Sequence, residues 1–486
     1  MRVIRYILLA LVILPALALI AFGPRAGESL PPGRVVVEYW EKWTGPEEQQ
    51  MRQIVDAFNA TVGREKGIFV RYVSTSAINQ KTLVATAAGA PPDIAGLWDS
   101  NIVPYAAEDA LEPLEDLAAA HGIGPATYKK AYWDACHYDG HLYALISTPG
   151  IVALLYNRLA FEQSAADLRA AGLDPDRPPR TLQELDRYAE ALTKRDASGR
   201  VLRSGYFPLE PGWYVPYTWM WFGGDVWDAR SGKLTLTDPK VVAAFDWIAG
   251  YTRRLGAGAA NEFRGGLGNF DSPQNGFLVN YVLMEQQGPW MANYIGNLRP
   301  DLQQLKWPRD VEMTKPVAER RQNYSWAVAP FPSAAPEVHD VTYATFDALV
   351  VPRGARHKRE AFEFIAYVNR PDVMEKLCML HCKNSPLATV SREFLDRHPN
   401  PYIGVFEELA GSPNARGVPQ IPIWPQIFDE LTSIGQEMSL GKGDAATALA
   451  RAQGRLQASL DNFRDKQRQR RGQGGSISAA TRGAVN

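Results

Sequence analysis

The sequence has few cysteines and no excess of charge of one sign. Its 486 residues include three cysteines, Cys136, Cys378 and Cys382, which are too few for a disulfide framework. The 52 Lys and Arg residues against 53 Asp and Glu residues leave a formal net charge of −1. No overall basic field is therefore available to hold a nucleic-acid backbone. We expect no nucleic-acid partner, and a fold that is held together by its hydrophobic core.

The sequence also lacks the short motifs of several common enzyme classes. It contains no Gly-x-Ser-x-Gly elbow and no His-Glu-x-x-His pair, which removes the simplest hydrolase and metalloprotease interpretations. Residues 40–45 lack the glycine pattern that binds a pyrophosphate. Residues 435–443 resemble a phosphate loop, but a glycine stands where Ser or Thr must reach magnesium. We predict no cofactor.

One short motif has ligand types that suit a metal. Cys378-x-x-His381-Cys382 brings together two thiols and an imidazole. The same spacing suits a buried thiol pair, or a small-loop disulfide in an oxidising compartment, and we favour these two interpretations. The prediction is that no metal binds here.

Residues 1–33 are typical of an export segment. Met1 to Arg5 carries two arginines, and Tyr6 to Phe22 follows without a charge, interrupted only by Pro15. A positive segment before an apolar one is typical of a signal peptide, although this apolar run also approaches the length of a membrane anchor. No second long apolar run follows. We expect the body, from about Arg34 on, to be soluble in the periplasm or another extracytoplasmic space, either released by cleavage or anchored by this segment.

The first third of the body alternates strand and helix patterns. Because this order predicts a parallel sheet with helices on its faces, ligands are expected beyond the carboxyl ends of the strands. Residues 40–45 and 98–101 follow two of these strands. The predicted elements are strands at 35–40, 68–73 and 93–98 and helices at 44–58 and 78–88.

Tryptophans are frequent, and several lie beside carboxylates. A flat aromatic face packs against the C–H groups of a sugar ring, while carboxylates and amides bind the hydroxyls at its edge. A Trp is also often buried, so a core position is an equal alternative for each single residue. The candidates are Trp40, Trp43, Trp98, Trp213, Trp219, Trp221, Trp290 and Trp424, with Glu41, Asp99 and Glu210 beside them.

Short segments in a fixed order match one family pattern. Residues 138–144 followed by 154–158 resemble its "YNGKLYA … LIYNKD" segment, residues 287–290 its "NGPW", and residues 326–332 its "YGVAPLP". Further matches are Pro91–Ile94, Ala110–Leu114, Pro179–Leu185 and Ile421–Leu460. Together they resemble the extracellular solute-binding proteins of bacterial ABC importers, in the group that includes maltose-binding protein.

The resemblance implies an α/β, two-lobed periplasmic-binding-protein fold of type II, with a hinge of several strands and a ligand cleft between the lobes. The chain would cross between the lobes near residues 148–151 and again near 345–349. We expect lobe 1 at 34–148 and 349–410, lobe 2 at 149–348 and 411–463, and a disordered basic tail at 464–486.

The resemblance also implies site residues. Trp290 corresponds to the family's stacking tryptophan, and Glu210 to the carboxylate of its "QEP" segment. Two departures leave the solute undetermined, since Gly150 replaces a ligand-contacting carboxylate of the maltose binder and Trp43-Thr44 replaces an Asp-Lys pair. The predicted ligand-binding residues are Trp40, Trp43, Trp98, Asp99, Glu210, Trp213, Trp290 and Trp424.

The function that follows is the substrate-binding component of an ABC importer, a monomer without enzymatic activity that captures a carbohydrate and delivers it to the permease subunits. An exported carbohydrate-active enzyme is an alternative, in which Asp99 and Glu210 would be cleft carboxylates. A membrane-tethered sugar-sensor component is another. The N-terminal segment would contact the membrane if it is not cleaved.

Overall fold

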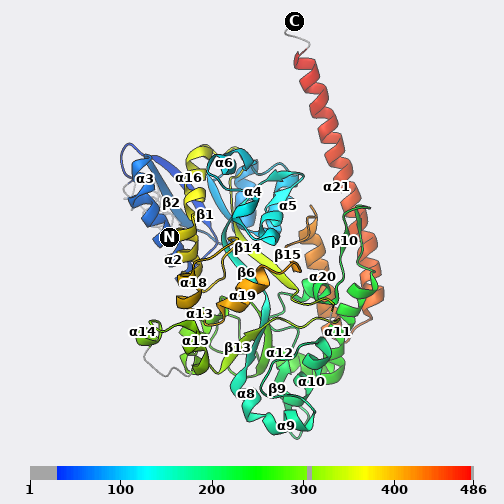
Figure 1. The fold of residues 1–486 in the computed structure, drawn as a ribbon. Helices are drawn as coiled ribbons and strands as arrows, with labels where there is room; N and C mark the ends of the chain where they lie inside the picture. The colour runs from blue at the N-terminus through cyan, green and yellow to red at the C-terminus, as the bar shows by residue number, and fades with distance from the viewer. Residues whose placement is uncertain (1–29, 304–308, 336, 483–486) are drawn as a thin grey trace, which may run out of the picture.

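Two α/β lobes, each built on its own sheet, make up the protein (Figure 1). The computed structural model describes residues 30–303, 309–335 and 337–482. Most of the predicted export segment, residues 1–29, lies outside the described residues. Within the described ranges no helix is both long and apolar enough to span a membrane.

The sheet of lobe 1 contains the predicted strand–helix alternation. Strands β1 (Val35–Glu41), β2 (Ile68–Ser74) and β3 (Ile94–Trp98) are parallel neighbours, which confirms the βαβαβ prediction. The strand order is β15-β14-β3-β1-β2, with β6 (Leu145–Ile151) paired to β14 (Thr342–Val350) and β15 at Ala415–Arg416. The helices around it are α2 (Gly45–Ala60), α3 (Val62–Glu65), α4 (Ile78–Ala87), α5 (Ile102–Ala107), α6 (Glu115–Ala120), α7 (Lys130–Ala135), α16 (Lys358–Val368), α17 (Pro371–Leu380), α18 (Arg392–Arg397) and α19 (Ile403–Ala410).

The sheet of lobe 2 has the order β13-β7-β12-β9-β8. Its strands are β7 (Ala153–Asn157), β8 (Lys194–Arg195), β9 (Val201–Tyr206), β12 (Val282–Gln287) and β13 (Trp326–Ala329). Its longer helices are α10 (Leu182–Leu192), α11 (Pro239–Leu255), α12 (Ala257–Gly265), α13 (Met291–Leu298), α20 (Trp424–Ser439) and α21 (Ala445–Arg482). Buried side chains of α11, α20 and α21, among them Ile248, Ile427 and Leu449, share one core with this sheet.

The two predicted crossing segments pair with each other. Strands β6 and β14 are antiparallel, with Thr148 opposite Asp347 and Gly150 opposite Thr345. After Ile151 the chain continues into β7 of the second sheet. The sheets therefore divide after Ile151 and before Thr342, whereas the predicted lobe boundaries at 148/149 and 348/349 fall within β6 and β14.

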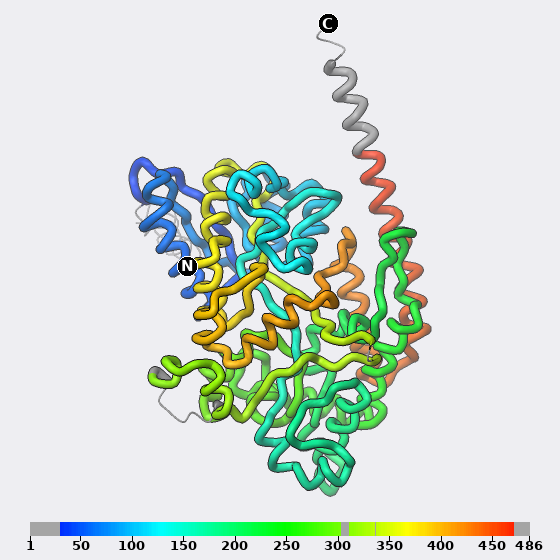
Figure 2. The backbone as a smooth tube through the Cα atoms, in the orientation of Figure 1, coloured from blue at the N-terminus to red at the C-terminus, as the bar shows by residue number. Residues whose placement is uncertain are grey.

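Helix α21 continues through the segment that we expected to be a disordered tail. The Nη1 atom of Arg464 donates to the carbonyl of Gly232 at 2.7 Å, within lobe 2. Gln467 Nε2 donates to the carbonyl of Ala107 at 2.7 Å, and Arg470 Nη1 lies 2.7 Å from a carboxylate oxygen of Glu108. Ala107 ends α5 of lobe 1, so the helix runs along both lobes (Figure 2). The prediction of disorder is wrong for residues 464–470, because these contacts hold the helix against the body.

Candidate functional site

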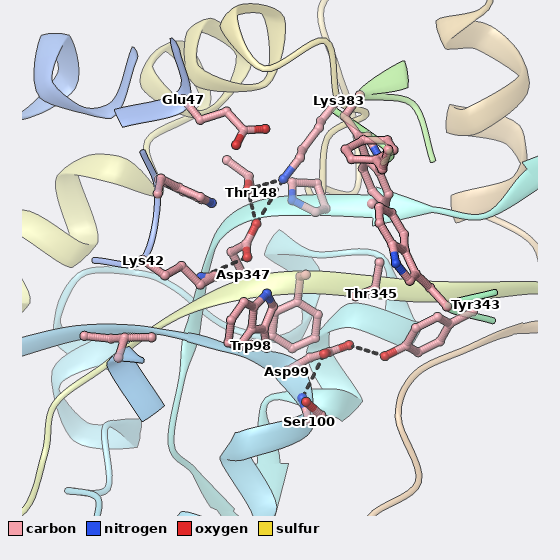
Figure 3. A pocket seen from close by; sticks show the side chains of 18 of the residues that line it. Lys42, Glu47, Trp98, Asp99, Ser100, Thr148, Tyr343, Thr345, Asp347 and Lys383 are labelled. Carbon is pink, nitrogen blue, oxygen red and sulfur yellow. Dashed lines mark hydrogen bonds and ion pairs between the residues drawn. The ribbon is translucent and has the colours of Figure 1, made fainter. Parts of the chain in front are cut away.

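A cavity of about 760 Å³ lies between the lobes (Figure 3). Lobe 1 and the crossing strands contribute Lys42, Trp43, Thr44, Glu47, Ser76, Ala77, Ile78, Trp98, Asp99, Ser100, Thr148, Pro149, Gly150, Tyr343, Thr345, Phe346, Asp347 and Lys383. We call this set the polar wall. Lobe 2 contributes Trp213, Tyr214, Tyr217, Phe270, Trp290, Tyr294 and Phe428. We call this second set the aromatic wall.

Asp347 on β14 binds two lysines of the polar wall. Its Oδ1 lies 2.9 Å from Lys42 Nζ, and its Oδ2 lies 2.9 Å from Lys383 Nζ (Figure 3). Thr148 Oγ1, on the neighbouring crossing strand, donates to the same Oδ2 at 2.7 Å. Although burial alone would raise the pKa of the Asp347 carboxyl, the two lysines hold it well below its usual range. The network is therefore an ionised, buried cluster at the hinge.

Glu41 also binds the side chain of Lys42. The side chain of Glu41 is fully buried and accepts hydrogen bonds from Tyr39 Oη at 2.6 Å and from the Lys42 backbone N–H at 2.7 Å. The Lys42 ammonium lies 3.2 Å from the same carboxylate. A Cβ atom at Gly96 would lie 1.9 Å from Glu41 Oε2, so the neighbouring strand needs a glycine at this position to make room for the carboxylate.

Asp99 connects the polar wall to the crossing strand and to lobe 2. Its Oδ2 accepts from Tyr343 Oη at 2.8 Å, and its Oδ1 accepts from the Ser100 backbone N–H at 2.8 Å. The Tyr343 ring stacks on Tyr217 of lobe 2 with centroids 4.1 Å apart. Burial raises the pKa of Asp99 to about 7, and the two hydrogen bonds oppose this shift. Asp99 can therefore change charge near neutral pH.

The aromatic wall presents ring faces and hydroxyls without charge. Among the described residues that line the cavity, lobe 2 contributes no Asp, Glu, Lys or Arg. Trp213 packs against Phe270 with centroids 4.6 Å apart, and Phe270 packs against Tyr294 at 4.4 Å. The Trp213 side chain is 42% exposed, which leaves part of its ring available to a ligand.

Trp290 is held by two glycines. A Cβ atom at Gly150 would lie 2.6 Å from the Trp290 ring, and one at Gly288 would lie 2.2 Å from it. The absence of both side chains lets the indole lie against the crossing strand and line the cavity. The ring therefore takes the space that a side chain at position 150 would need.

Five of the eight predicted ligand-binding residues line this cavity, and they come from both lobes. They are Trp43, Trp98, Asp99, Trp213 and Trp290. Trp43 and Trp98 also lie beside the lysine network, since Lys42 Nζ is 5.2 Å from the centroid of each ring. Contact of these five residues with a ligand remains a prediction.

Two of the predicted tryptophans lie elsewhere. Trp40 projects from the other face of β1 and lines a surface groove with Pro91 and Pro92. Trp424 is 1% exposed in the core of lobe 2, and its ring packs beside Tyr217 with centroids 5.6 Å apart. Trp219 and Trp221 are likewise buried. For Trp219, Trp221 and Trp424 the core interpretation holds, because helix packing covers their rings, whereas Trp40 is partly buried beside the surface groove.

Glu210 does not line the cavity either. It is 9% exposed, and one of its oxygens accepts a hydrogen bond of 3.4 Å from Asn275. Burial raises the pKa of Glu210 to about 7. Nearby Glu285 is fully buried, and neither of its carboxylate oxygens has a hydrogen-bond partner among the described residues. The prediction that Glu210 faces the cleft is wrong in this structure, since the loop before Trp213 turns its side chain into lobe 2.

Sequence reasoning missed the lysine network. Lys42, Asp347 and Lys383 come from three distant segments, so no local motif contains them. One signal was present, since Asp347 interrupts the apolar run of β14 and a charge in a buried strand requires a partner.

The Cys378-His381-Cys382 motif belongs to the core. All three cysteines lie within the described ranges, where they are buried and form no disulfide. Cys378 Sγ lies 3.7 Å from Met374 Sδ, and the His381 ring packs against Trp43 with centroids 4.9 Å apart. In the part of the chain that the structure describes, no group of three His, Cys, Asp or Glu side chains is placed to hold a metal.

A comparison with known protein families shows to which family this two-lobed chain belongs. The family model of the bacterial extracellular solute-binding protein matches residues 53–391. The chain belongs to this family. The predicted resemblance to solute-binding proteins is thereby confirmed.

Individual relatives and solved structures agree with the family. The solute-binding chain is 23% identical over 434 residues to a binding protein of Brucella abortus (strain 2308), covering 87% of this chain and 92% of that protein. It is 26% identical over 204 residues to the sn-glycerol-3-phosphate-binding periplasmic protein UgpB of Pectobacterium atrosepticum, covering 41% of each chain.

Solved structures share the fold at low identity. CpMnBP1 with mannobiose bound has a TM-score of 0.70 and 22% identity, covering 87% of this chain and 99% of that one. UgpB of Mycobacterium tuberculosis with glycerophosphocholine has a TM-score of 0.65 and 19% identity, covering 88% and 99%. These similarities confirm the type II periplasmic-binding-protein fold with two α/β lobes.

Proposed function

We propose that this protein binds a carbohydrate between its lobes and delivers it to the membrane permease of an ABC importer. The chemistry of the cavity carries the proposal. Ring faces of Trp213 and Trp290 on the aromatic wall lie in one cavity with the hydrogen-bonding side chains of the polar wall. A sugar ring has both an apolar C–H face and a rim of hydroxyls, so it suits such a pair of walls.

The relatives support a small polar solute. One solved structure that shares this fold holds mannobiose, and another is the sugar-binding protein MalE of Xanthomonas citri, with a TM-score of 0.67 and 19% identity. The matched family and these relatives are binding proteins.

Binding without turnover is the role that we propose. A glycosidase places two carboxyl groups across the scissile bond, about 5–9.5 Å apart. Of the two carboxylates considered for that role, Asp99 lines the cavity, whereas the side chain of Glu210 is buried in lobe 2. Asp99 is also held by Tyr343 and by a backbone N–H, which suits a fixed acceptor.

The protein would act outside the cytoplasmic membrane as a monomer. Residues 1–33 would serve either as a cleaved signal or as an anchor that keeps the body near the permease. The mass of the N-terminal peptide after export from its host distinguishes these two forms.

A thermal-shift screen of the body, residues 34–486, against a panel of neutral mono- and oligosaccharides tests the proposal. A ligand that binds only the folded state raises the melting temperature by mass action. We expect at least one saccharide to do so, with no sugar released during overnight incubation. Stabilisation by no saccharide would contradict the proposal, and accumulation of a cleaved product would favour the enzyme alternative.

A further inference from the structure

Two charged groups of the polar wall have unused hydrogen-bonding capacity. Glu47 lies in the first turn of α2, is half-buried and lines the cavity. Lys383 is 7% exposed and lines the same cavity. Figure 3 shows both side chains at the same end of the cavity, with no hydrogen bond or ion pair drawn between them.

Lys383 uses two of its three N–H donors within the protein. Its Nζ donates to Asp347 Oδ2 at 2.9 Å and to Thr148 Oγ1 at 2.8 Å. An ammonium group has three donors, so one remains for a ligand. The ammonium also lies 5.6 Å from the centroid of the Trp290 ring. A group that accepts from Lys383 therefore lies near the aromatic face that is available for stacking.

Lys42 has no such capacity left. Four oxygens lie within 3.5 Å of its Nζ, from Asp347, Glu41 and the carbonyls of Gly96 and Leu97. Its charge is balanced by the buried carboxylates of Glu41 and Asp347. Lys42 is thus committed to the protein, and Lys383 is the lysine that can donate to a solute.

Glu47 supplies the complementary acceptor. In the part of the chain that the structure describes, the Glu47 carboxylate forms no hydrogen bond or ion pair, and Figure 3 shows none between it and the other residues drawn. The pKa of the Glu47 carboxyl is raised, chiefly by burial and further by Asp347 and Glu41, while Lys383 and Lys42 oppose this rise. The nearby lysines thus favour the ionised form of Glu47 without binding it directly.

We propose that Glu47 and Lys383 bind one hydroxyl of an uncharged sugar, which donates to Glu47 and accepts from Lys383, and that this pair excludes ionised solutes. The inference rests on the proposed carbohydrate function. A hydroxyl is both donor and acceptor, so it satisfies both groups. A phosphate or carboxylate would accept from Lys383 but face the Glu47 carboxylate, and an ammonium would donate to Glu47 but face Lys383. A solute charge placed beside a side chain of the same sign is repelled, and this repulsion opposes binding.

The test compares neutral and ionised probes on wild type and two matched variants. Glu47→Gln removes the cavity carboxylate. Glu48→Gln removes the same charge from the same helix turn, but Glu48 pairs with Arg52 at 2.9 Å and does not line the cavity. The probes are the neutral saccharide that gives the largest thermal shift, sn-glycerol 3-phosphate, glucuronic acid and glucosamine, each titrated calorimetrically.

We expect wild type to bind the neutral saccharide at least tenfold more tightly than each ionised probe. Glu47→Gln should weaken the saccharide about tenfold, because a charge-assisted hydrogen bond is lost, and should strengthen binding of the two anions. Glu48→Gln should leave all affinities unchanged.

Three results would overturn the inference. Tighter binding of an anion or of glucosamine by wild type would refute selection for uncharged solutes, while the solute-binding role would stand. Unchanged affinities in Glu47→Gln would remove Glu47 from the site. Equal losses in Glu47→Gln and Glu48→Gln would show a general charge effect. Failure of every neutral saccharide to bind would instead overturn the proposed function itself.

Discussion

Different interactions hold the side chains of the two cavity walls in position. In the polar wall, Asp347 fixes Lys42 and Lys383 through ion pairs of 2.9 Å. Hydrogen bonds within such pairs depend on the angle between donor and acceptor, so they fix the orientation of each side chain. In the aromatic wall, Trp290 and Trp213 are positioned by packing, against glycines in one case and against Phe270 in the other. Ring faces accept many orientations of a sugar, whereas fixed donors and acceptors accept few. If the cavity binds a sugar as we propose, the aromatic wall would supply general affinity and the polar wall discrimination.

Removing the central charge of the polar wall should have the largest effect on stability. Asp347→Asn leaves two buried ammonium groups without their shared counter-ion, which typically costs about 3–5 kcal/mol of unfolding free energy. Denaturant unfolding of the body measures the loss. Asp372→Asn is the control, because Asp372 forms an exposed ion pair with Arg370 and should cost little. Equal stability of the two variants would contradict a structural role for the network.

Removing the Trp290 ring from the aromatic wall should affect the affinity for the solute more than the stability of the protein. Trp290→Ala is expected to cost about 2 kcal/mol of binding free energy, which is roughly 30-fold, because the stacking face is lost. Calorimetric titration with the cognate saccharide measures this. Trp247→Ala is the control, since Trp247 hydrogen-bonds to Asp186 away from the cavity and should alter stability alone. If Trp247→Ala weakened binding equally, the assignment of Trp290 would fail.

The buried Asp99 should make the stability of the apo protein depend on pH. Its pKa is about 7 in the folded protein, chiefly through burial and with Asp347 adding to the shift, against about 4 in an unfolded chain. Between these values the folded state holds a proton that the unfolded state releases, so the free energy of unfolding falls as the pH rises from about 4 to about 7.

Asp99→Asn removes this proton and should reduce the fall by up to about 1.4 kcal/mol per pH unit within that range. Unfolding curves at several pH values give the slope for both proteins. A slope that is identical in Asp99→Asn would show that Asp99 titrates near its ordinary value in the folded state.

The smallest expected effect concerns the contacts of α21 with lobe 1. Ending the chain after Phe463 removes the contacts of Gln467 with Ala107 and of Arg470 with Glu108 in lobe 1, together with that of Arg464 with Gly232 in lobe 2, so the melting temperature should fall slightly. Ending it after Arg470 keeps these contacts and should leave the melting temperature unchanged. Identical melting curves for the two truncations would show that residues 464–470 contribute nothing to stability.

Much of the fold could be predicted from the sequence. Short segments such as residues 287–290 occur in the same order as in the family pattern, and the hydrophobic periodicity of each strand or helix can be read from neighbouring residues. The site was accessible only in part. Trp43, Trp98 and Trp290 follow strand ends or a glycine turn, which made them detectable. Their location could be inferred because strand ends meet at one edge of a sheet.

The remaining site residues depend on tertiary contacts. Lys42, Asp347 and Lys383 come from distant segments, so no local motif joins them, and only Asp347 carries a signal of its own by interrupting an apolar strand. Trp424 was assigned to the site by its residue type, yet the packing of α20 buries it. Glu210 followed the family pattern, but the orientation of a side chain within its loop is not encoded by that pattern.

The burial of the Lys42–Asp347–Lys383 network has a consequence for the medium in which the protein works. Mobile ions screen exposed charges over about 10 Å at 0.1 M salt, but they screen buried pairs far less. A protein that acts outside the cytoplasmic membrane, as we propose for this one, would meet a salinity that the cell does not control. We expect the affinity of the polar wall for an uncharged solute to be nearly independent of ionic strength. The protein would then bind its solute equally well in dilute and in saline surroundings.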